Sequence, residues 1–521
     1  MAADPHTPPS LPATTLDLHG FIDVVLGGHA FRASESDLAK AQRAYEHLLA
    51  FADGKVIYGI NTGFGPMAQH AVPPADRTTL QYNLVRSHAA GAGDDLPDET
   101  VRAMLLVRAI TFLQGGSAVS REVIEQLIAF LDKGICPRVP SQGGVGASGD
   151  LTQQAHLGLG LIGGGDGRVM GRSATMASIL EANGLAPVQL KLRDGLAIVN
   201  GTACMTGAGL LNVHHAMLLL DRSIAMSAML TELVGAWDDH LSAPLNEAKR
   251  HAGQREVASL MRTALDGSQL VRSRHEHLYN GSIGASNGTF AEVVQELYSI
   301  RCVPQILGPV MDTVRNAERV LLDELYSIDD NPLTDPERGV FHGGNFHGDQ
   351  VALEMDKLRL AVVKMCMLCE RQLNFLLNDR ANNRFPAFLN METPGLTLGM
   401  QGMQFTATST TAENQALATS LYVHSIPNNN DNQDVVSMGT NAALATTRVL
   451  NNTGRVMSIL AIALAQAADI AGRNSELSTC GHTLHGSVRA ATDPIVSSSD
   501  PAGSIAAVEQ ALFTPRSTWR K

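Results

Sequence analysis

The segment SQGGVGASGD, at residues 141–150, has the residue types and the spacing with which a backbone could do chemistry on itself. Glycines stand on both sides of Ser148, so the chain can bend there where side chains would otherwise clash. In a tight enough bend the amide nitrogen of Gly149 can attack the carbonyl carbon of Ala147, and loss of water closes a five-membered ring. Dehydration of Ser148 then leaves an exocyclic methylidene. The product, a 4-methylideneimidazol-5-one (MIO), is a strong electrophile of a kind that no ordinary side chain supplies.

The same glycines have a simpler interpretation, a tight turn before a helix. Asp150 stands where it can cap a helix predicted over Leu151–Leu161, and Gln153 follows three residues later, as in a capping box. The loop would then end at the positive end of the helix dipole, which favours negative charge. The loop by itself does not decide between a turn and a ring.

Ordered blocks along most of the chain resemble those of one enzyme family. GGVGASGDL, at 143–151, resembles the signature of the aromatic amino-acid ammonia-lyases, the histidine, phenylalanine and tyrosine enzymes whose MIO group forms from Ala-Ser-Gly. The resemblance runs from about Lys55 to Ala468. The other matching blocks are YGINTGFG (58–65), SHAAGAG (87–93), GLAIVNGT (195–202), YSIRCVPQ (298–305), DNP (330–332), HGGNFHG (342–348) and NNNDNQDVVSMGT (428–440).

The resemblance implies catalytic roles for individual residues. Ser148, with Ala147 and Gly149, would form MIO, and Asn200 would hydrogen-bond the oxygen of that group. Tyr58, in a second glycine-rich loop at 58–69, would remove the β-proton of the substrate. A phenol whose pKa is tuned toward the working pH suits that task.

The resemblance also implies the residues that hold the substrate. Tyr298 matches a second active-site tyrosine, and Arg301 matches the arginine whose guanidinium fork holds the substrate carboxylate. The other predicted substrate-binding positions are Gly65, Ser87, His88, Asn331, Phe346 and Gln433. Each residue alone has an ordinary structural explanation, and the ordered set carries the prediction.

Two positions favour different substrates. The pair Ser87-His88 is the pattern of histidine ammonia-lyases. Those enzymes carry a glutamate where this chain has Gln433, however, and an amide cannot supply the charge that suits an imidazole partner. Glutamine there is the pattern of the phenylalanine and tyrosine enzymes.

Longer segments resemble a bacterial tyrosine ammonia-lyase subgroup that also carries Ser-His. They are VIYGINTGFGPMAQ (56–69), LQYNLVRSHAAGAG (80–93), WDDHLSAPLNEAKRH (237–251) and MQGMQFTATSTTAENQ (400–415). His88 could then hydrogen-bond a substrate phenol, because neutral imidazole both donates and accepts. We therefore predict elimination of ammonia from L-tyrosine to give trans-p-coumarate. The alternatives are a histidine ammonia-lyase that makes urocanate, a phenylalanine ammonia-lyase and a tyrosine aminomutase.

Other classes of function fit less well. Gly158-x-Gly160-x-x-Gly163 matches a dinucleotide-binding pattern, but the preceding segment is polar and helical where a strand is needed. Pairs of histidines at 214–215 and at 342 and 347 lack a third ligand at metal spacing. A non-catalytic scaffold is disfavoured because Ser148, Tyr58 and Arg301 are intact. We expect no metal and no nucleotide.

Composition narrows the partners and the compartment. The net charge is −12, from 39 basic and 51 acidic residues, which disfavours binding to nucleic acid or to an anionic membrane. Six cysteines in 521 residues do not form a disulfide scaffold, so we expect reduced thiols and a cytoplasmic protein. Cys366 and Cys369 form a CxxC, which we expect to be core thiols on a helix, with a redox or metal pair as the alternative. The longest apolar stretches, such as Met457–Ala468, fall short of the roughly 20 residues that span a bilayer.

The elements that must position these residues are mostly helices. Aromatic residues make up only 4%, which disfavours a β-sandwich, and helical periodicity recurs throughout. We predict a mainly α fold in which a smaller N-terminal α+β domain (16–205) carries both glycine-rich loops and a long-helix bundle domain follows (206–521), with residues 1–15 as a flexible tail. The predicted helices are 35–51, 77–87, 98–114, 122–133, 151–161, 208–237, 288–307, 313–323, 351–378 and 440–470, with strand-like pieces at 15–18 and 21–26 and an irregular tail after Asn474. Helices this long also suggest an oligomer, and the family implies a homotetramer with shared active sites.

Overall fold

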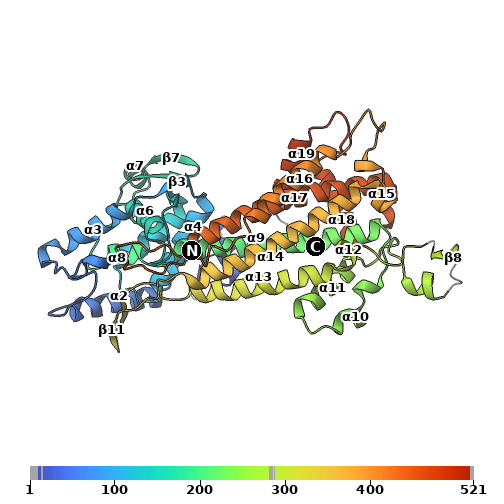
Figure 1. Ribbon diagram of the computed structural model, residues 1–521. Coiled ribbons are helices and arrows are strands. Elements are labelled where there is room, and N and C mark those ends of the chain that lie inside the picture. Colours follow the sequence, from blue (N-terminus) through green and yellow to red (C-terminus); the bar gives the residue numbers. More distant parts are fainter. Residues whose placement is uncertain (1–9, 13–15, 281–284, 287, 291, 517–521) are drawn as a thin grey trace, which may run out of the picture. The chain divides into compact units, whose positions relative to one another are not determined.

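The structure is a computed structural model that describes residues 10–12, 16–280, 285–286, 288–290 and 292–516 (Figure 1). It is predominantly helical with a few short strands, so the predicted mainly α fold class is confirmed. Most of the predicted tail at 1–15 lies outside the described residues. Within it, Ser10–Pro12 form strand β1, which pairs in parallel with β2 (Ala30–Arg32).

The chain divides into two compact units, each made of several segments. Unit 1 comprises Met1–Asn212, Ala317–Asp356 and Ser420–Ala445, and unit 2 comprises Val213–Asn316, Lys357–Thr419 and Thr446–Lys521. The domain boundary that the sequence suggests, after residue 205, falls inside helix α9 (Ala203–Leu233). Unit 1 also takes in two later segments because their loops hydrogen-bond residues of the N-terminal part, as described below.

Long helices form the core of both units. The predicted helices at 208–237, 351–378 and 440–470 are α9, α14 (Asp349–Leu377) and α17 (Gly439–Ala471). In unit 1, the amide of Asn212 on α9 donates to the carbonyl of Ala443 on α17 at 2.8 Å. In unit 2, Gln372 on α14 donates to the hydroxyl of Ser227 on α9, also at 2.8 Å. The helices therefore pack directly against one another within each unit.

The CxxC lies in this helical core. Cys366 and Cys369 are 0% exposed on α14, and all six cysteines are free thiols. Burial raises the pKa of Cys369 to about 12, so the thiol stays protonated. The prediction that these are core thiols is confirmed.

Two helices are long and apolar enough to cross a membrane by length and composition, α9 and α17. The sequence-based expectation that no stretch reaches that length is therefore wrong. In each helix most of the apolar window, 83% in α9 and 78% in α17, is buried inside the protein. A core helix of a soluble protein has the same properties, so this finding is weak evidence for a membrane span.

The smaller α+β region lies in unit 1, as predicted. Its helices are α3 (Arg77–His88), α4 (Asp98–Leu113), α5 (Arg121–Lys133), α6 (Leu151–Leu161), α7 (Met176–Ala182) and α8 (Asp194–Val199). Its strands are β3 (Ala92–Asp95) paired antiparallel with β5 (Pro140–Gln142), and β4 (Ile135–Pro137), β6 (Asp166–Val169) and β7 (Arg172–Thr175), which form an antiparallel sheet in the order β4-β6-β7. Strand β5 leads into the glycine-rich loop that carries Ser148, and α6 follows that loop.

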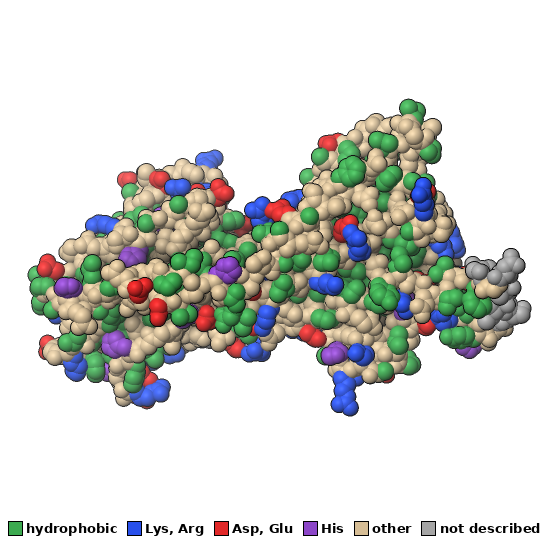
Figure 2. Space-filling view, in the orientation of Figure 1, with side chains coloured by type: hydrophobic (Ala, Val, Ile, Leu, Met, Phe, Trp, Pro, Cys, Tyr) green, Lys and Arg blue, Asp and Glu red, His purple; other side chains and the backbone are tan. Residues whose placement is uncertain are grey.

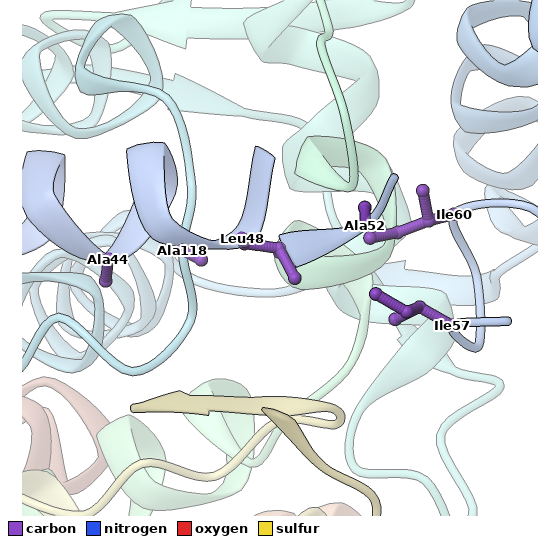
Figure 3. Packing of buried hydrophobic residues seen from close by; sticks show 6 residues of the cluster. All are labelled: Ala44, Leu48, Ala52, Ile57, Ile60 and Ala118. Atoms are coloured by element: carbon purple, nitrogen blue, oxygen red, sulfur yellow. The ribbon is translucent and has the colours of Figure 1, made fainter. Parts of the chain in front are cut away.

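A small apolar cluster fixes the loop that carries Tyr58. Ile57 and Ile60 are each 1% exposed and pack with residues of α2 (Glu35–Phe51), among them Leu48 (Figure 3). Fully burying such a side chain stabilises the fold by about 1.5–3 kcal/mol. The two isoleucines flank Tyr58, so their burial sets the course of the backbone there.

Two predicted elements, a strand-like piece at 21–26 and a helix at 288–307, differ from the structure. Helix α1 (Leu18–Val25) replaces the strand-like piece predicted at 21–26, because Asp17 caps it by accepting from the backbone N–H of Gly20 at 2.8 Å. The helix predicted at 288–307 is also wrong. Its first described part pairs as a short hairpin of β8 (Ala285–Ser286) and β9 (Thr289–Phe290), and regular helix begins only at α12 (Tyr298–Arg301).

The chain after Asn474 is more regular than its serine-rich composition suggests. It contains α18 (Thr479–Ala491) and α19 (Pro501–Leu512), which are capped by Ser478 and Asp500. The remaining elements are α10 (Ala243–Glu247), α11 (Ala252–Ala264), α13 (Val303–Leu325), α15 (Asp379–Asn382), α16 (Gln401–Ala416), β10 (Leu333–Asp335) and β11 (Gly339–Phe341). On the face in Figure 2, basic and acidic side chains are scattered among neutral ones and do not gather into a basic stripe.

Candidate active site

A cavity of about 270 Å³ in unit 1 collects most of the predicted site residues. Eight of them line it, namely Tyr58, Gly65, His88, Ser148, Asn200, Asn331, Phe346 and Gln433. They come from segments far apart in the sequence, so the fold brings the matching blocks together. Its other lining residues are Phe64, Ala68, Leu84, Leu151, Leu196, Val199, Asn429 and Asn432.

The loop that carries Ser148 is closed by crowding of the backbone. Gly149 has φ +72°, and a Cβ on it would lie 1.9 Å from the carbonyl oxygen of Gly201. Any side chain at 149 would therefore collide with the next segment of backbone. The N–H of Asp150 donates to the same Gly201 carbonyl at 2.7 Å, and this bond fastens the loop to the segment that carries Asn200.

Two amide side chains hold Ser148. Asn200 donates from Nδ2 to the Ser148 carbonyl at 3.0 Å, and Gln433 donates from Nε2 to the Ser148 hydroxyl at 2.9 Å. The N–H of Asn331 in turn donates to Oδ1 of Asn200 at 2.9 Å, which fixes the orientation of that amide. Gln433 is 8% exposed, so its amide is directed at Ser148 within the protein.

Asp150 does not cap α6 with its side chain, so the predicted capping box is wrong. Its carboxylate accepts from the N–H of Met205 at 2.9 Å and from the hydroxyl of Thr440. Gln153 donates instead to the carbonyl of Ser141 at 3.2 Å. Burial raises the pKa of Asp150 to about 6. The carboxylate thus joins the loop to α9 and α17, an arrangement that a local capping pattern does not reveal.

Tyr58 lines the cavity, and its hydroxyl takes part in a hydrogen bond. The phenol oxygen accepts from the N–H of Gly65 at 2.9 Å, and the ring meets that of Phe64 edge-on at 6.1 Å. Burial raises the pKa of Tyr58, and the Gly65 hydrogen bond opposes that rise. Among the described residues of unit 1, burial therefore outweighs the Gly65 hydrogen bond, and the pKa of this phenol is not tuned toward neutral pH as expected.

His88 ends α3 and is the member of the Ser-His pair that lines the cavity. Its Nδ1 lies 3.1 Å from the carbonyl oxygen of Leu84 and 3.1 Å from the hydroxyl oxygen of Ser87. Because a carbonyl only accepts, the contact with Leu84 favours the tautomer that carries the proton on Nδ1. Burial lowers the pKa of His88, which keeps the ring neutral and leaves Nε2 as an acceptor. Ser87 instead donates to the same Leu84 carbonyl at 3.1 Å and is not among the lining residues.

Two predicted residues lie in unit 2, outside the residues that line this cavity. Tyr298 and Arg301 are the ends of α12. The guanidinium carbon of Arg301 lies 4.8 Å from the centre of the Tyr298 ring, and Tyr298 is 68% exposed. Tyr298 and Arg301 therefore contact each other and belong to unit 2, whereas Ser148 and Tyr58 belong to unit 1.

The sequence carried signals for some of the lining residues that were missed. Leu84 lies one helical turn before His88, so the two share a face of α3. Asn429 and Asn432 belong to the same block as Gln433. Phe64 belongs to the block that opens with Tyr58. Leu151, Leu196 and Val199 are apolar and carry no signal that separates them from core residues.

The alternative sites that the sequence raised are placed as follows. Gly158 and Gly160 lie inside α6, where the dinucleotide pattern requires a turn between strand and helix. His342 accepts through Nε2 from the N–H of Tyr58 at 3.3 Å. In the described part of the chain, no three His, Cys, Asp or Glu side chains are grouped so that they could hold a metal ion.

The loop that carries Ser148 fits the MIO group that the sequence predicts. The crowding at Gly149 and the amides on Ser148 fit a ring built from Ala147, Ser148 and Gly149, because a Cβ at 149 has no room and the Ser148 carbonyl has a donor. The family described as "Aromatic amino acid lyase" matches residues 16–490. The chain belongs to this family. One similar protein, 37% identical over 87% of this chain and 85% of the other, is a "MIO-dependent tyrosine 2,3-aminomutase" of Streptomyces globisporus.

The names of similar proteins refer to different amino acids. The chain is 41% identical to a "Tyrosine 2,3-aminomutase" of Myxococcus sp. (strain Mx-B0), over 79% of each chain. It is 39% identical to a "Tyrosine ammonia-lyase" of Cupriavidus metallidurans and to a "Histidine ammonia-lyase" of Geobacillus thermodenitrificans, in both cases over 83% of this chain and 82% of the other. Among solved structures, a tyrosine aminomutase from Streptomyces globisporus superposes with a TM-score of 0.93 at 34% identity, over 98% of this chain and 97% of the other.

Proposed function

We propose that this enzyme is a tyrosine ammonia-lyase, which eliminates ammonia from L-tyrosine to give trans-p-coumarate. The observation that carries the proposal is the hold on Ser148 by Asn200 and Gln433 in the cavity that also contains Tyr58 and His88. The protein groups in that cavity are a serine flanked by small residues, a phenol and a neutral imidazole. They match the needs of an elimination from an aromatic amino acid.

The MIO group would form from this chain without a metal or a nucleotide. The nitrogen of Gly149 bonds to the carbonyl carbon of Ala147, and the carbonyl oxygen leaves as water with the amide hydrogens of Gly149 and Ser148. A second water takes the hydroxyl and the α-hydrogen of Ser148. Once formed, the group supplies an electrophile for the substrate amine, which makes ammonia a better leaving group.

Tyr58 would accept the β-proton of the substrate at its phenol oxygen. The N–H of Gly65 already points at that oxygen and favours the phenolate, although burial opposes it. A cation near the phenol would counter the effect of burial and lower its pKa, and Arg301 is the predicted guanidinium of the site. We propose that Arg301 and Tyr298 of a neighbouring subunit complete the cavity, in a homotetramer whose active sites are shared.

His88 supports tyrosine as the substrate. A neutral ring with a free Nε2 accepts a hydrogen bond from a phenol O–H, whereas phenylalanine would leave that nitrogen unpaired. Sites built around a substrate hydroxyl reject the analogue without it by about 10⁴-fold or more in strong cases. Gln433 disfavours histidine, because an amide offers an imidazolium no charge. The relatives named tyrosine ammonia-lyase and tyrosine aminomutase agree with a tyrosine substrate.

Two other outcomes follow from the same site. A tyrosine aminomutase would return the ammonia to the β-carbon, and two relatives named "Tyrosine 2,3-aminomutase" are 41% and 38% identical to this chain. A histidine ammonia-lyase would use the Ser87-His88 pair. The direct test is to offer L-tyrosine, L-phenylalanine and L-histidine separately and to identify each product. p-Coumarate as the main product supports the proposal; a β-amino acid or urocanate as the main product contradicts it.

We also propose a cytoplasmic location and a free amino acid as the only ligand, with no nucleic acid and no membrane as partner. The acidic composition and the six free thiols support this. Fractionation of the native cells, with activity followed in the soluble and membrane fractions, would test it.

A further inference from the structure

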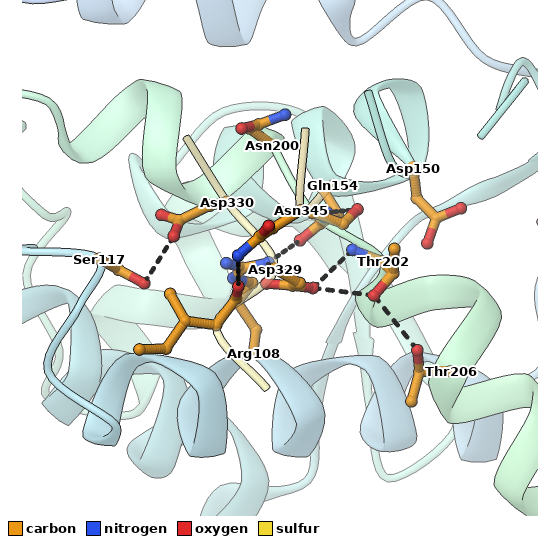
Figure 4. Close-up of polar contacts among 12 residues, drawn as sticks. Arg108, Ser117, Asp150, Gln154, Asn200, Thr202, Thr206, Asp329, Asp330 and Asn345 are labelled. Carbon is orange, nitrogen blue, oxygen red and sulfur yellow. Dashed lines mark hydrogen bonds and ion pairs between the residues drawn. The ribbon is translucent and has the colours of Figure 1, made fainter. Parts of the chain in front are cut away.

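A buried ion pair lies behind the loop that carries Ser148 and is not used by the proposed reaction. Nη1 of Arg108, on α4, lies 3.1 Å from Oδ1 of Asp329 (Figure 4). The side chains are 0% and 1% exposed, and neither residue lines the cavity. Buried ion pairs often contribute little to stability against apolar replacements, because the charges must give up water. The role of this pair is therefore better sought in the segments that it holds in place.

The pair holds the segment that begins at Gly201. Oδ2 of Asp329 accepts from the N–H of Thr202 at 2.6 Å and from its hydroxyl at 2.9 Å. A Cβ on Gly201 would lie 2.1 Å from Nη1 of Arg108 and 2.8 Å from either carboxylate oxygen of Asp329. The ion pair thus packs directly on the backbone of Gly201.

Gly201 is also crowded against the predicted ring-forming residues. Gly149 approaches so closely that a Cβ on it would lie 1.9 Å from the Gly201 carbonyl oxygen. That oxygen also accepts from Nε2 of Gln154 at 2.5 Å, and Nη1 of Arg108 donates to Oε1 of Gln154 at 3.4 Å (Figure 4). The backbone of Gly201 is therefore in close contact with both the ion pair and Gly149.

We propose that Arg108 and Asp329 are positioning residues for formation of the MIO group. They hold Gly201 against Gly149, which keeps the Gly149 nitrogen near the carbonyl carbon of Ala147 until the N–C bond forms and two waters leave. The pair touches none of the reacting atoms, so it acts through Gly201 and through Thr202 and Gln154 beside it. This inference rests on the proposed function, because it requires that the ring forms.

The test compares the masses of intact chains with their stabilities. Wild type, Asp329→Asn and Glu232→Gln are purified, and each is measured by intact-protein mass, circular dichroism, thermal unfolding and oligomeric state. Asparagine keeps the size of the side chain at 329 but removes the charge that faces Arg108. Glu232 is the matched control, a buried carboxylate in unit 2 that accepts from the N–H of Ser478 at 2.7 Å and does not touch the loop.

We expect wild type and Glu232→Gln to lack two waters in nearly every chain. In folded Asp329→Asn, the fraction that lacks two waters should fall at least tenfold. Arg108→Lys, which keeps the charge but not the reach to Gln154, should give an intermediate fraction. These are differences in covalent maturation, which a purely structural pair would not produce.

The pair is merely structural if Asp329→Asn and Arg108→Lys are folded and lack both waters as completely as wild type. Failure of both variants to yield soluble protein would also overturn the proposal, because it would assign the pair to folding. A wild-type chain with its full sequence mass contradicts the proposed function instead. The two failures are therefore distinguishable in one experiment.

Discussion

The two glycine-rich loops of the candidate site are held by different means. The Tyr58 loop is anchored by apolar side chains, since Ile57 and Ile60 are buried in a small cluster. The Ser148 loop is anchored by backbone crowding at Gly149 and by hydrogen bonds from Asn200 and Gln433. A base needs only a stable position, which burial supplies. A backbone that must cyclise needs atoms forced close together, which only small residues permit.

The largest effect should come from Ser148→Ala. Alanine has no hydroxyl to lose, so the methylidene cannot form, and activity should fall by about 10⁴–10⁶-fold, as when an essential catalytic group is removed. The intact mass of wild type should be short of its sequence mass by two waters, and that of Ser148→Ala should not. A variant that keeps its fold and its activity would show that Ser148 is not the source of the electrophile.

Tyr58→Phe should separate the two loops. Its mass should still lack two waters, because the Ser148 loop is untouched, while kcat should fall by about 10²–10⁴-fold, the usual contribution of a general base. Circular dichroism controls for folding. A Tyr58→Phe chain at full sequence mass would mean that the Tyr58 loop takes part in maturation, and the contrast between the loops would fail.

The pH dependence should report the same phenol. Burial raises the pKa of Tyr58, so the phenolate is scarce at neutral pH and becomes more abundant as the pH rises. We expect kcat/KM to increase with pH on the alkaline side of neutrality, by up to about tenfold per unit for one proton. The residual rate of Tyr58→Phe serves as the control, because any slope that it retains belongs to the substrate amine. Equal slopes in the two proteins would exclude Tyr58 as the titrating base.

Ile57→Ala should weaken the apolar anchor. Ile57 is 1% exposed, and removing such a side chain costs about 2–5 kcal/mol of unfolding free energy. We expect kcat to fall several-fold, while the intact mass still shows that every chain has lost the two waters of MIO formation. The matched control is Ile124→Ala, which is 0% exposed on α5 and does not belong to the Tyr58 cluster. That variant should lose similar stability and keep its kcat, and an equal fall in kcat would show a general effect of destabilisation.

The comparison also explains how far the sequence could predict this molecule. Long periodic helices such as α14 and α17 follow from the spacing of apolar residues, and the ordered blocks predicted half of the residues that line the cavity. The capping role predicted for Asp150 is wrong, because the local sequence is the same whether its carboxylate caps the next helix or contacts a distant one. Its partner Thr440 lies on α17, and only the fold brings the two together.

Other features were out of reach for related reasons. Helices α1 and α18, near the two ends of the chain, were not predicted. Each is capped by a single polar side chain, Asp17 or Ser478, and such a residue does not stand out in a polar or serine-rich segment. The ion pair of Arg108 and Asp329 joins residues that are distant in the sequence, and neither belongs to a motif that the sequence analysis used for chemistry. Contacts of this kind depend on packing and are not encoded in local spacing.

The smallest expected effect concerns Gln433, where the Ser148 loop meets the choice of substrate. Its Nε2 donates to the Ser148 hydroxyl at 2.9 Å, so one of the hydrogen bonds that its amide can make is used by the loop. Gln433→Glu would add a charge that favours an imidazole, and a charge-assisted bond exceeds a neutral one by an amount worth roughly fivefold. We expect the ratio of kcat/KM for histidine to that for tyrosine to rise by about that factor. The intact mass is the control, since incomplete loss of water would lower both activities together, and an unchanged ratio in fully matured protein would show that Gln433 serves Ser148 alone.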